Sequence, residues 1–250
     1  MSTPKRRIQN TLIGSPPIYL AARRWFGVAR FIARKPHDPD FRYFSRFSNS
    51  NGLFLDVGAN SGSSALSYRI FDRSSQIVSL EPNPAHERDL SLVQRIIGPD
   101  FSYHLQGAAE EDGELTLFIP EHRGVPLTGE ASIYRGEAAD NWTAKQLGIS
   151  ISDIDITQVR VPVRPIDELK LNPHAVKVDV QGAELLVLKG MQDTLERAHP
   201  VLLIEASADT PRVTAQLSPL GYKAYWYDTT RDQLKPYDGR AITNVFFVVG

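Results

Sequence analysis

The fold of this 250-residue chain is decided by the stretch Leu53-Phe54-Leu55-Asp56-Val57-Gly58-Ala59-Asn60-Ser61-Gly62. A short apolar run ends in an acid and leads into a turn of small residues, and a helical pattern follows from about Ser63 to Phe71. Such a run, bounded by turn residues, is typical of a buried parallel strand. Glycine removes the Cβ atoms that would keep a ligand off the backbone, asparagine tolerates positive φ, and a helix start presents free N–H groups. The stretch therefore predicts a strand, a tight turn and a helix that hold a nucleotide-like ligand.

The acid inside this turn discriminates between such ligands. A dinucleotide-binding fold favours G-x-G-x-x-G, with the pyrophosphate on the helix start, whereas this turn reads D-x-G-x-N-x-G. Asp56 would repel a pyrophosphate but can accept hydrogen bonds from an ammonium group. S-adenosylmethionine carries an amino-acid end and no phosphate, so the turn favours this cofactor over NAD. A purely structural turn is the alternative at this point.

A second strand pattern, Gln76-Ile77-Val78-Ser79-Leu80-Glu81, also ends in an acid. Glu81 lies about as far downstream as the acid that binds the ribose hydroxyls in a βαβ unit. The stiff turn Pro82-Asn83-Pro84 follows and fixes where the carboxylate points. We therefore expect Glu81 to bind a ribose. The alternative is an exposed acid before a helix cap.

Composition excludes several classes of function. The apolar fraction of 42% is that of a globular protein, and the length fits one large α/β domain or one domain with additions. A net charge of -1 gives no electrostatic argument for a nucleic-acid partner. The chain has no cysteine, which excludes disulfides, thiolate metal sites and cysteine nucleophiles. No apolar stretch approaches the roughly 20 residues that span a bilayer, and no signal-peptide pattern is present, so we expect a cytoplasmic protein.

The chain divides into a basic leader, residues 1–50, and a domain, residues 51–250. Up to position 40 the leader has eight Lys or Arg and two acids. Its stretch from Pro17 to Arg34 is predicted to be a helix that packs on the core or covers the substrate mouth. The alternative is a helix that contacts an anionic membrane surface weakly, since it combines basic residues with Trp and Phe.

From residue 51 onward, strand and helix patterns alternate, which predicts a mostly parallel sheet with helices on both faces. Strand patterns occupy 53–57, 76–81, 101–105, 174–180, 200–206, 222–227 and 243–249, and helix patterns occupy 63–71, 84–97, 183–198 and 209–220. Two strand-like runs, 114–119 and 159–164, have no helix between them and are expected to form an antiparallel addition. The segment 120–157 lacks periodicity and is predicted to be an insertion that serves as a lid or binding loop.

A third motif is Val176-Lys177-Val178-Asp179-Val180-Gln181-Gly182-Ala183-Glu184. Lys177 and Asp179 alternate on one face of its strand, and buried parallel strands rarely carry two charges without a reason. Asp179 lies at the carboxyl end of the strand, where open α/β sheets bind ligands. Both residues are therefore catalytic candidates, with a structural ion pair as the alternative. Glu184 falls in the first turn of the helix that follows, where interaction of its charge with the helix dipole is sufficient to explain it.

Together the three motifs resemble the FkbM family of S-adenosylmethionine-dependent methyltransferases. Further matches are Ala108 to Leu117, Pro165-Ile166-Asp167-Glu168-Leu169, Leu188-Lys189-Gly190 and Leu203-Ile204-Glu205. The resemblance covers about residues 52–249 and leaves the basic leader outside. Gln181 departs from the family pattern, which usually has an acid at this position. If that acid serves as a base or metal ligand in other members of the family, this chain lacks that group.

The resemblance implies an α/β, Rossmann-like fold with a seven-stranded, mostly parallel sheet, helices on both faces and an antiparallel last strand. It also implies O-methylation: the transfer of a methyl group from S-adenosylmethionine to a hydroxyl of a sugar, a glycan or a secondary metabolite such as a polyketide. The cofactor-binding residues are then expected to be Asp56, Gly58, Ala59, Asn60, Gly62, Glu81, Pro82, Asn83, Ala108, Ala109 and Asp179. Asp179, with Lys177 beside it, is the candidate catalytic base or the residue that orients the amino-acid end of the cofactor.

Three alternatives stay open at this point. No spacing of His, Asp and Glu indicates a metal site, although Asp179 and Glu205 could hold a magnesium ion that assists O-methyl transfer. The chain could be a non-catalytic, cofactor-binding adaptor that acts through its leader or insertion. It could also be an NAD-type oxidoreductase, which the acid in the first turn disfavours. The sequence does not distinguish a monomer from a dimer.

Overall fold

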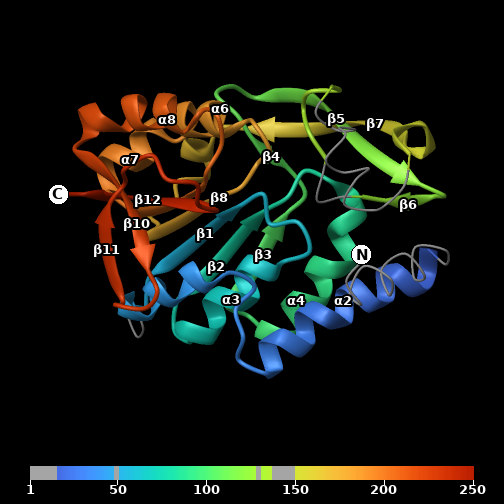
Figure 1. The fold of residues 1–250 in the computed structure, drawn as a ribbon, viewed down its shortest axis with the longest axis horizontal. Helices are drawn as coiled ribbons and strands as arrows, with labels where there is room; N and C mark the ends of the chain where they lie inside the picture. The colour runs from blue at the N-terminus through green and yellow to red at the C-terminus, as the bar shows by residue number, and fades with distance from the viewer. Residues whose placement is uncertain (1–15, 48–50, 128–130, 137–149) are drawn as a thin grey trace.

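The computed structural model describes residues 16–47, 51–127, 131–136 and 150–250, and a large mixed sheet forms its centre (Figure 1). Within these residues the sheet has eight strands in the order β11-β10-β12-β9-β8-β1-β2-β3. The strands are β1 (Leu53–Val57), β2 (Gln76–Leu80), β3 (Phe101–His104), β8 (Ala175–Val178), β9 (Val201–Glu205), β10 (Tyr222–Asp228), β11 (Gln233–Pro236) and β12 (Asn244–Val249). Strands β3, β2, β1, β8 and β9 pair in parallel, and β12 runs antiparallel to both β9 and β10.

The expected count of seven strands is wrong by one. Strand β11 pairs antiparallel with the second half of β10 and forms one edge of the sheet. Its sequence, Gln-Leu-Lys-Pro, is short and mostly polar and ends in proline, which is typical of an edge strand and leaves no periodic signal. The last strand, β12, is antiparallel as expected.

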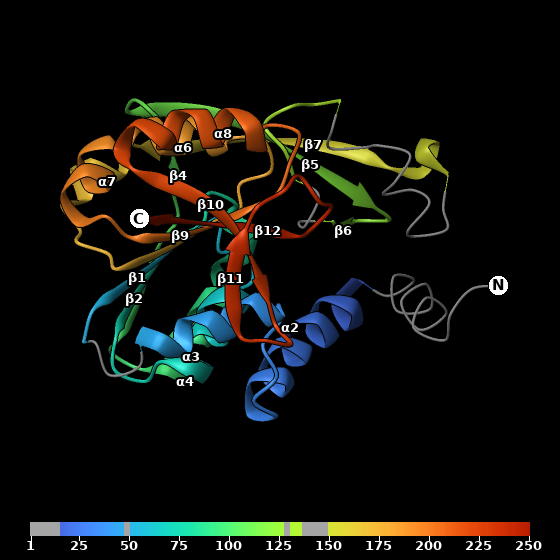
Figure 2. The same cartoon turned by 60° about the vertical axis from the view of Figure 1, so that its left-hand side comes forward.

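Helices cover both faces of the sheet (Figures 1 and 2). One face carries α2 (Pro16–Ile32), α3 (Ser63–Phe71) and α4 (Glu87–Ile97), and the other carries α6 (Glu184–Lys189), α7 (Gln192–Ala198) and α8 (Thr210–Leu217). The helix expected over 183–198 is divided at Gly190 into α6 and α7, and glycine is required there because a Cβ would overlap the carbonyl oxygen of Ala109. Helix α2 lies against α3, and Arg24 on it forms an ion pair of 2.6 Å with Asp89 on α4.

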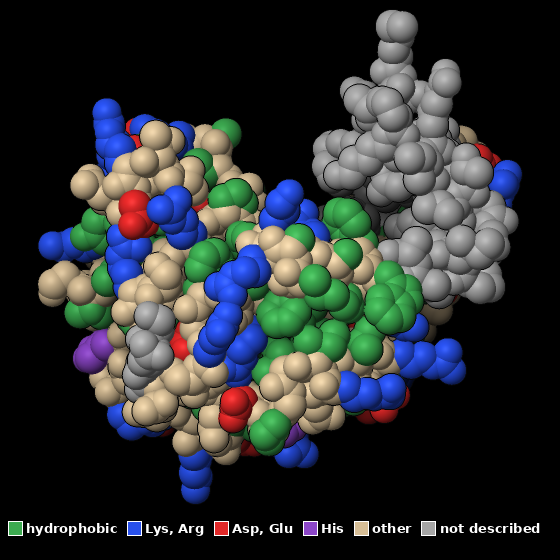
Figure 3. Space-filling view, turned by 90° about the horizontal axis from the view of Figure 1, so that it is seen from below, with side chains coloured by type: hydrophobic (Ala, Val, Ile, Leu, Met, Phe, Trp, Pro, Cys, Tyr) green, Lys and Arg blue, Asp and Glu red, His purple; other side chains and the backbone are tan. Residues whose placement is uncertain are grey.

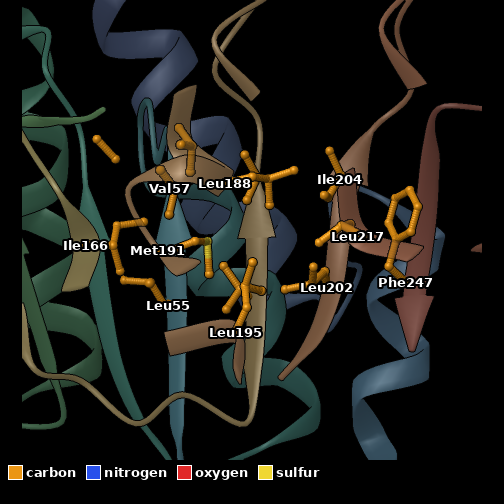
Figure 4. Close-up of a cluster of buried hydrophobic side chains, with 14 of the residues drawn as sticks. Leu55, Val57, Ile166, Leu188, Met191, Leu195, Leu202, Ile204, Leu217 and Phe247 are labelled. Carbon is orange, nitrogen blue, oxygen red and sulfur yellow. The ribbon is translucent and has the colours of Figure 1, made fainter. Parts of the chain in front are cut away.

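The larger hydrophobic core lies between the sheet and the helices α6, α7 and α8 (Figure 4). Leu55 and Val57 of β1 point into it, since alternate residues of a strand face the same side. They meet Leu188 and Leu195 from the helices and Leu202 from β9, all fully buried. Each such side chain contributes about 1.5–3 kcal/mol on burial, so this core fixes the strand ends where the polar residues of the motifs lie.

The opposite core is aromatic and includes part of the predicted leader. The 3₁₀ helix η1 (Pro39–Phe47) places Phe41 and Phe44 in it with no exposed surface. The ring of Phe44 lies 5.6 Å from that of Phe54, which stacks on Tyr68 at 4.0 Å. Phenylalanines at 41, 44 and 47 share one face because a 3₁₀ helix has three residues per turn. The division at residue 50 stays a prediction, but residues 41 and 44 pack with the domain.

A small second sheet stands beside the first (Figure 1). It contains β4 (Gly107–Ala108), β5 (Gly113–His122), β6 (Val125–Pro126) and β7 (Asp155–Arg164), with β5 and β7 antiparallel, which confirms the predicted antiparallel addition. The end of β5 and the start of β7 extend into the segment 120–157 that was expected to be an insertion without strands. Residues 128–130 and 137–149 of that insertion lie outside the described residues. The other 3₁₀ helices are η2 (Pro84–His86), η4 (Ile151–Asp153), η5 (Ile166–Leu169) and η6 (Ser218–Leu220).

The face that carries α2, α3 and α4 presents hydrophobic side chains between lysines and arginines (Figure 3). On α2, Trp25, Phe26 and Ile32 keep 62%, 59% and 75% of their surface exposed. None of the helices in the described ranges has the length and apolar character needed to cross a membrane.

Candidate functional site

A cavity of about 380 Å³ lies at the carboxyl ends of β1, β2, β8 and β9 and reaches the small sheet. One part of its lining is polar and includes Asn60, Ser61, Ser63, Glu81, Asp179, Gln181 and Glu205. The other part is apolar and includes Leu80, Pro82, Ala108, Leu115, Leu117, Val161 and Val163. Open α/β sheets bind their ligands at this edge, and the volume falls within the roughly 300–1,000 Å³ of small-molecule sites.

The backbone N–H groups of the first turn are bound by the end of β2 and by the turn itself. The N–H groups of Gly58 and Ala59 donate to the carbonyl oxygen of Leu80 at 2.9 and 3.0 Å. The Asn60 N–H donates to Oε2 of Glu81 at 2.7 Å, and Asn60 adopts the expected positive φ of 49°. The Ser61 N–H donates to Oδ1 of Asn60 at 2.8 Å. The turn and the following strand end are therefore held together as one unit.

The glycines also have a reason that the sequence did not predict. A Cβ at Gly58 would overlap the carbonyl oxygen of Asp179, and one at Gly62 would lie 2.7 Å from Val93 on α4. Both residues also have positive φ, 84° and 79°. Glycine is thus required by the packing of the chain on itself, and the close approach of a ligand to this backbone stays a prediction. Gly58 still lines the cavity together with Ala59 and Asn60, whereas Gly62 does not.

Glu81 is the link between the first and second motifs. Its Oε2 accepts from Asn60 and its Oε1 accepts from the backbone N–H of Asn83 at 2.8 Å. Burial raises the pKa of this carboxyl. Pro82 lines the cavity beside it. Asn83 does not, because its side chain caps η2 by accepting from the Ala85 N–H at 3.0 Å.

Asp56 lies beneath the turn and not in the cavity. It has no exposed surface, and its Oδ2 accepts from the hydroxyl of Ser79 at 3.2 Å. Its Oδ1 has no hydrogen-bond partner among the described residues. Burial raises the pKa of Asp56 to about 7, opposed by the charge of Lys177 on the neighbouring strand. Asp56 thus supports the turn from below and does not line the cavity, and its expected contact with an ammonium group stays a prediction.

The third motif forms a hydrogen-bonded network with the end of β9. Lys177 Nζ lies 3.3 Å from Oδ2 of Asp179, and Nε2 of Gln181 donates to Oδ1 of Asp179 at 3.3 Å and to Oε2 of Glu205 at 3.0 Å. Gln181 holds this position with a positive φ of 51°. Lys177 itself is buried, with 2% of its surface exposed, and does not line this cavity.

The two carboxyls of this network are driven to opposite protonation states. Burial alone would raise the pKa of Asp179, but the charge of Lys177 and its hydrogen bonds lower it below the usual value. Burial, followed by the negative charge of Asp179, raises the pKa of Glu205 to about 8. At neutral pH the site therefore holds an ionised Asp179 beside a protonated Glu205.

The residues after β3 are only partly placed as expected. Gly107 and Ala108 line the cavity. Ala109 lies behind them, where its N–H donates to the carbonyl oxygen of Arg164 at 3.2 Å and its own carbonyl packs on Gly190. Ala109 thus holds the small sheet to the large one.

Several lining residues were not predicted as site residues. His37, which precedes η1, reaches the cavity, and its Nδ1 lies 2.8 Å from the Ser67 hydroxyl. No periodicity marks it, because it follows a helix in a short polar run. The inward residues of β5 and β7 belonged to predicted strands, but which way they face follows from tertiary packing. Glu205 and Gln181 stood in recognised motifs without an assigned role in cofactor binding. In the part of the chain that is described, no group of three His, Asp or Glu side chains is arranged to hold a metal ion.

Comparison with known proteins identifies relatives of this fold. A family model described as Methyltransferase FkbM domain matches residues 56–224. The crystal structure of methyltransferase FkbM from Methylobacillus flagellatus KT has a TM-score of 0.50 and 18% identity, with 79% of this chain and 44% of that chain covered. Precorrin-6y C5,15-methyltransferase from Geobacter metallireducens GS-15 has a TM-score of 0.42 and 13% identity, with 82% of each chain covered. Fibrillarin from Aeropyrum pernix with natively bound S-adenosyl-L-methionine has a TM-score of 0.41 and 16% identity, with 80% and 66% covered.

No curated protein sequence matches the chain. The chain spans less than half the length of the Methylobacillus protein, and at these identities the likeness to solved structures concerns the fold alone. The family match, in contrast, extends over most of the chain and contains all three motifs. The resemblance drawn from the motifs is confirmed: this chain belongs to the FkbM methyltransferase domain family.

Proposed function

We propose that this protein transfers the methyl group of S-adenosylmethionine to a hydroxyl oxygen of a small molecule or glycan. The observation that carries the proposal is the cavity at the strand ends, in a chain of the FkbM methyltransferase domain family. It brings Glu81, an apolar slot and the ionised Asp179 together in one volume.

The cavity fits this cofactor at both ends. Each carboxylate oxygen of Glu81 accepts one backbone N–H and keeps lone pairs for ribose hydroxyls. The apolar slot between Pro82, Ala108 and Val163 is suited to the face of a purine ring. Asp179 and the first turn supply oxygen atoms for the amino-acid end.

The turn is less suited to a dinucleotide. A pyrophosphate is usually bound by free backbone N–H groups at a glycine-rich turn. Here the N–H groups of residues 58 to 62 already have acceptors. Those of residues 58 to 60 donate to Leu80 and Glu81 at the end of β2, and those of residues 61 and 62 donate to Asn60 and Ala59 within the turn. This arrangement favours S-adenosylmethionine over NAD.

When bound, S-adenosylmethionine supplies an electrophilic methyl group whose bond to sulfur breaks as the bond to the acceptor oxygen forms. Because such a displacement is in line, positioning supplies much of the catalysis. Asp179 is ionised and can orient the acceptor hydroxyl. A carboxylate with a lowered pKa is a weak base, so it takes the proton at Oδ as that hydroxyl becomes acidic in the transition state. Lys177 holds Asp179 in place.

The test is a methyl-transfer assay with methyl-labelled cofactor and a panel of hydroxylated acceptors, with the methylated atom identified by NMR. We expect an O-methyl product, and we expect Asp179→Asn to reduce turnover by about 100-fold or more. Asp193→Asn, an exposed position on α7, serves as the matched control. Undiminished turnover by Asp179→Asn would remove the role given to Asp179. Cofactor binding without transfer to any acceptor would favour the non-catalytic adaptor.

We also propose that α2 contacts anionic membrane surfaces weakly. The exposed Trp25, Phe26 and Ile32 stand on a helix followed by the exposed Arg34 and Lys35, a combination typical of interfacial helices. Sedimentation with phosphatidylserine vesicles, compared with phosphatidylcholine vesicles, tests this contact. Binding should be salt-sensitive and should fall in Trp25→Ala, and equal recovery with both vesicle types would contradict it.

A further inference from the structure

A second cavity adjoins the first and is larger, about 810 Å³ against 380 Å³. His37 and Asp179 line both, so they form the boundary between the two volumes. The remaining walls come from two distant parts of the chain, residues 38–40 after α2 and residues 226–244 around β10, β11 and β12. Lys177, buried behind Asp179, also reaches this cavity.

Two carboxylates in this cavity are held in place by one buried amide. Nδ2 of Asn244, which has 3% of its surface exposed, donates to Oδ2 of Asp38 at 2.7 Å and to Oδ2 of Asp40 at 3.1 Å. The backbone N–H of Asp40 donates to Oδ1 of Asp38 at 2.8 Å. Each carboxylate offers about four lone-pair sites, so the pair can still accept several hydrogen bonds from a ligand.

The charges around the pair select the kind of ligand. Both cations that line the cavity already have acidic partners: Lys177 pairs with Asp179 at 3.3 Å and Arg240 with Asp238 at 2.6 Å. Within the described residues, neither Asp38 nor Asp40 has a cationic side chain within 4 Å. An anionic ligand would meet like charge here, and an apolar one would desolvate the two carboxylates without replacing their hydrogen bonds. A ligand that donates hydrogen bonds fits, which describes both a hydroxyl-rich molecule and an ammonium group; the apolar surface described next favours the former.

The same cavity offers an apolar surface. Pro39, Ala241 and Ile242 supply it, together with the part of the half-buried Trp226 ring that is left open by the guanidinium of Arg240, 3.9 Å from the ring centre, and by Lys235, 5.1 Å from it. A sugar ring presents both features that this wall would meet, neighbouring hydroxyls on its edge and C–H groups on its face. A ring seated there would lie beside His37 and Asp179, where the first cavity begins.

We propose that this second cavity is the acceptor site and that Asp38 and Asp40, oriented by Asn244, bind neighbouring hydroxyls of a neutral sugar. The inference rests on the proposed function, because it takes the first cavity to hold the cofactor. Asn244 acts as a positioning residue. The leader thus contributes acceptor-binding side chains, Asp38 directly before η1 and Asp40 in its first turn.

The experiment measures binding to the full chain saturated with S-adenosylhomocysteine. The probes are three neutral methyl glycosides (of glucose, mannose and rhamnose), the methyl glycoside of glucuronic acid, the methyl glycoside of glucosamine, and cyclohexylmethanol. Saturation-transfer NMR ranks the probes, and calorimetry gives the dissociation constants. Asp38→Asn and Asp40→Asn keep the shape of the site, and Asp193→Asn on the far face is the matched control.

We expect at least one neutral glycoside to bind, the glucuronide to bind at least 10-fold more weakly, and Asp40→Asn to weaken the neutral glycoside by about 10-fold or more. The control should change nothing, and every variant should keep the wild-type affinity for S-adenosylhomocysteine. The proposal is overturned if the glucuronide, the amino sugar or cyclohexylmethanol binds best, if no neutral glycoside binds, or if Asp38→Asn and Asp40→Asn leave binding unchanged. Failure to bind S-adenosylhomocysteine would instead overturn the proposed function, whatever the glycosides do.

Discussion

The two cavities of this protein are built in different ways. The first is formed largely by turns that directly follow buried strands, so Gly58, Glu81 and Asp179 each belong to a contiguous motif. The second joins residues that are 204 and 206 positions apart, as in the bonds from Asn244 to Asp40 and Asp38. The difference teaches that the first cavity is encoded locally, whereas the second exists only after the chain has packed.

Packing of the second cavity depends on η1. Phe41 and Phe44 anchor this helix in the aromatic core. His37 and Asp38, directly before the helix, and Asp40, in its first turn, are thereby brought to the strand ends. The first cavity needs no such anchor, because its turn is closed by bonds to Leu80 and Glu81. Changes in the core under η1 should therefore separate the two halves.

Phe44→Ala should have the largest effect. Removing a fully buried ring costs about 3–5 kcal/mol of folding free energy, which corresponds to a decrease in Tm of roughly 10 °C for a chain of this size. Among the molecules that stay folded, methyl glycoside affinity should fall more than S-adenosylhomocysteine affinity. Phe26→Ala, at an exposed position on α2, is the control and should change Tm by little. Equal losses in both affinities would show that the two cavities are not separately supported.

Gln181→Glu should have an intermediate effect. The amide donates to both Asp179 and Glu205, and an ionised glutamate would instead place a third acid beside them. We expect turnover at neutral pH to fall by about 10-fold and to recover partly at lower pH, where the added acid is protonated. Gln76→Glu on the exposed start of β2 is the control. A pH profile identical to that of the wild type would mean that Gln181 does not set the charge of this network.

Glu205→Gln should have the smallest effect, visible as a pH dependence of stability. Glu205 has a folded-state pKa of about 8 against the usual 4.5, so the folded state binds the proton more tightly. Its contribution to stability is then present below about pH 4.5 and is lost as the pH rises through about 8. The variant lacks this loss. Because Glu205 is partly exposed and solvent screens its charge, we expect a net effect of only about 1 kcal/mol, so the Tm of the variant relative to the wild type should rise by about 2–4 °C between pH 5 and pH 8.5. A difference in Tm that is constant with pH would contradict the raised pKa.

Much of the first region could be predicted from the sequence. The limits of β1 and α3 are those expected, because a buried parallel strand and the helix after it carry strong and distinct periodicities. The acids at the strand ends followed from the rule that ligands bind there, and Glu81 and Asp179 do line the cavity. Asp56 and Lys177 stand in the same motifs but do not line this cavity, because each is the last but one residue of its strand and lies below the edge where Glu81 and Asp179 follow their strands.

The second region could not be predicted, because its elements are short and its contacts join distant parts of the chain. Helix η1 and strand β11 are short, and a 3₁₀ spacing of phenylalanines or a polar edge strand gives no helix or strand periodicity. Asp38 and Asp40 look like ordinary turn residues until Asn244 is brought to them from the other end of the chain. The requirement for glycine at position 190 likewise depends on a contact with Ala109 that only the folded chain makes.

The most direct test of the account is a calorimetric titration of the protein with S-adenosylmethionine, S-adenosylhomocysteine and NAD. We predict micromolar binding of the two sulfur ligands and no binding of NAD. Glu81→Ala should weaken the sulfur ligands by roughly 10- to 100-fold, since it removes charged hydrogen bonds. Glu87→Ala, at an exposed position on α4, should leave them unchanged. Binding of NAD, absence of binding by both sulfur ligands, or full affinity in Glu81→Ala would contradict the assignment of the first cavity to the cofactor.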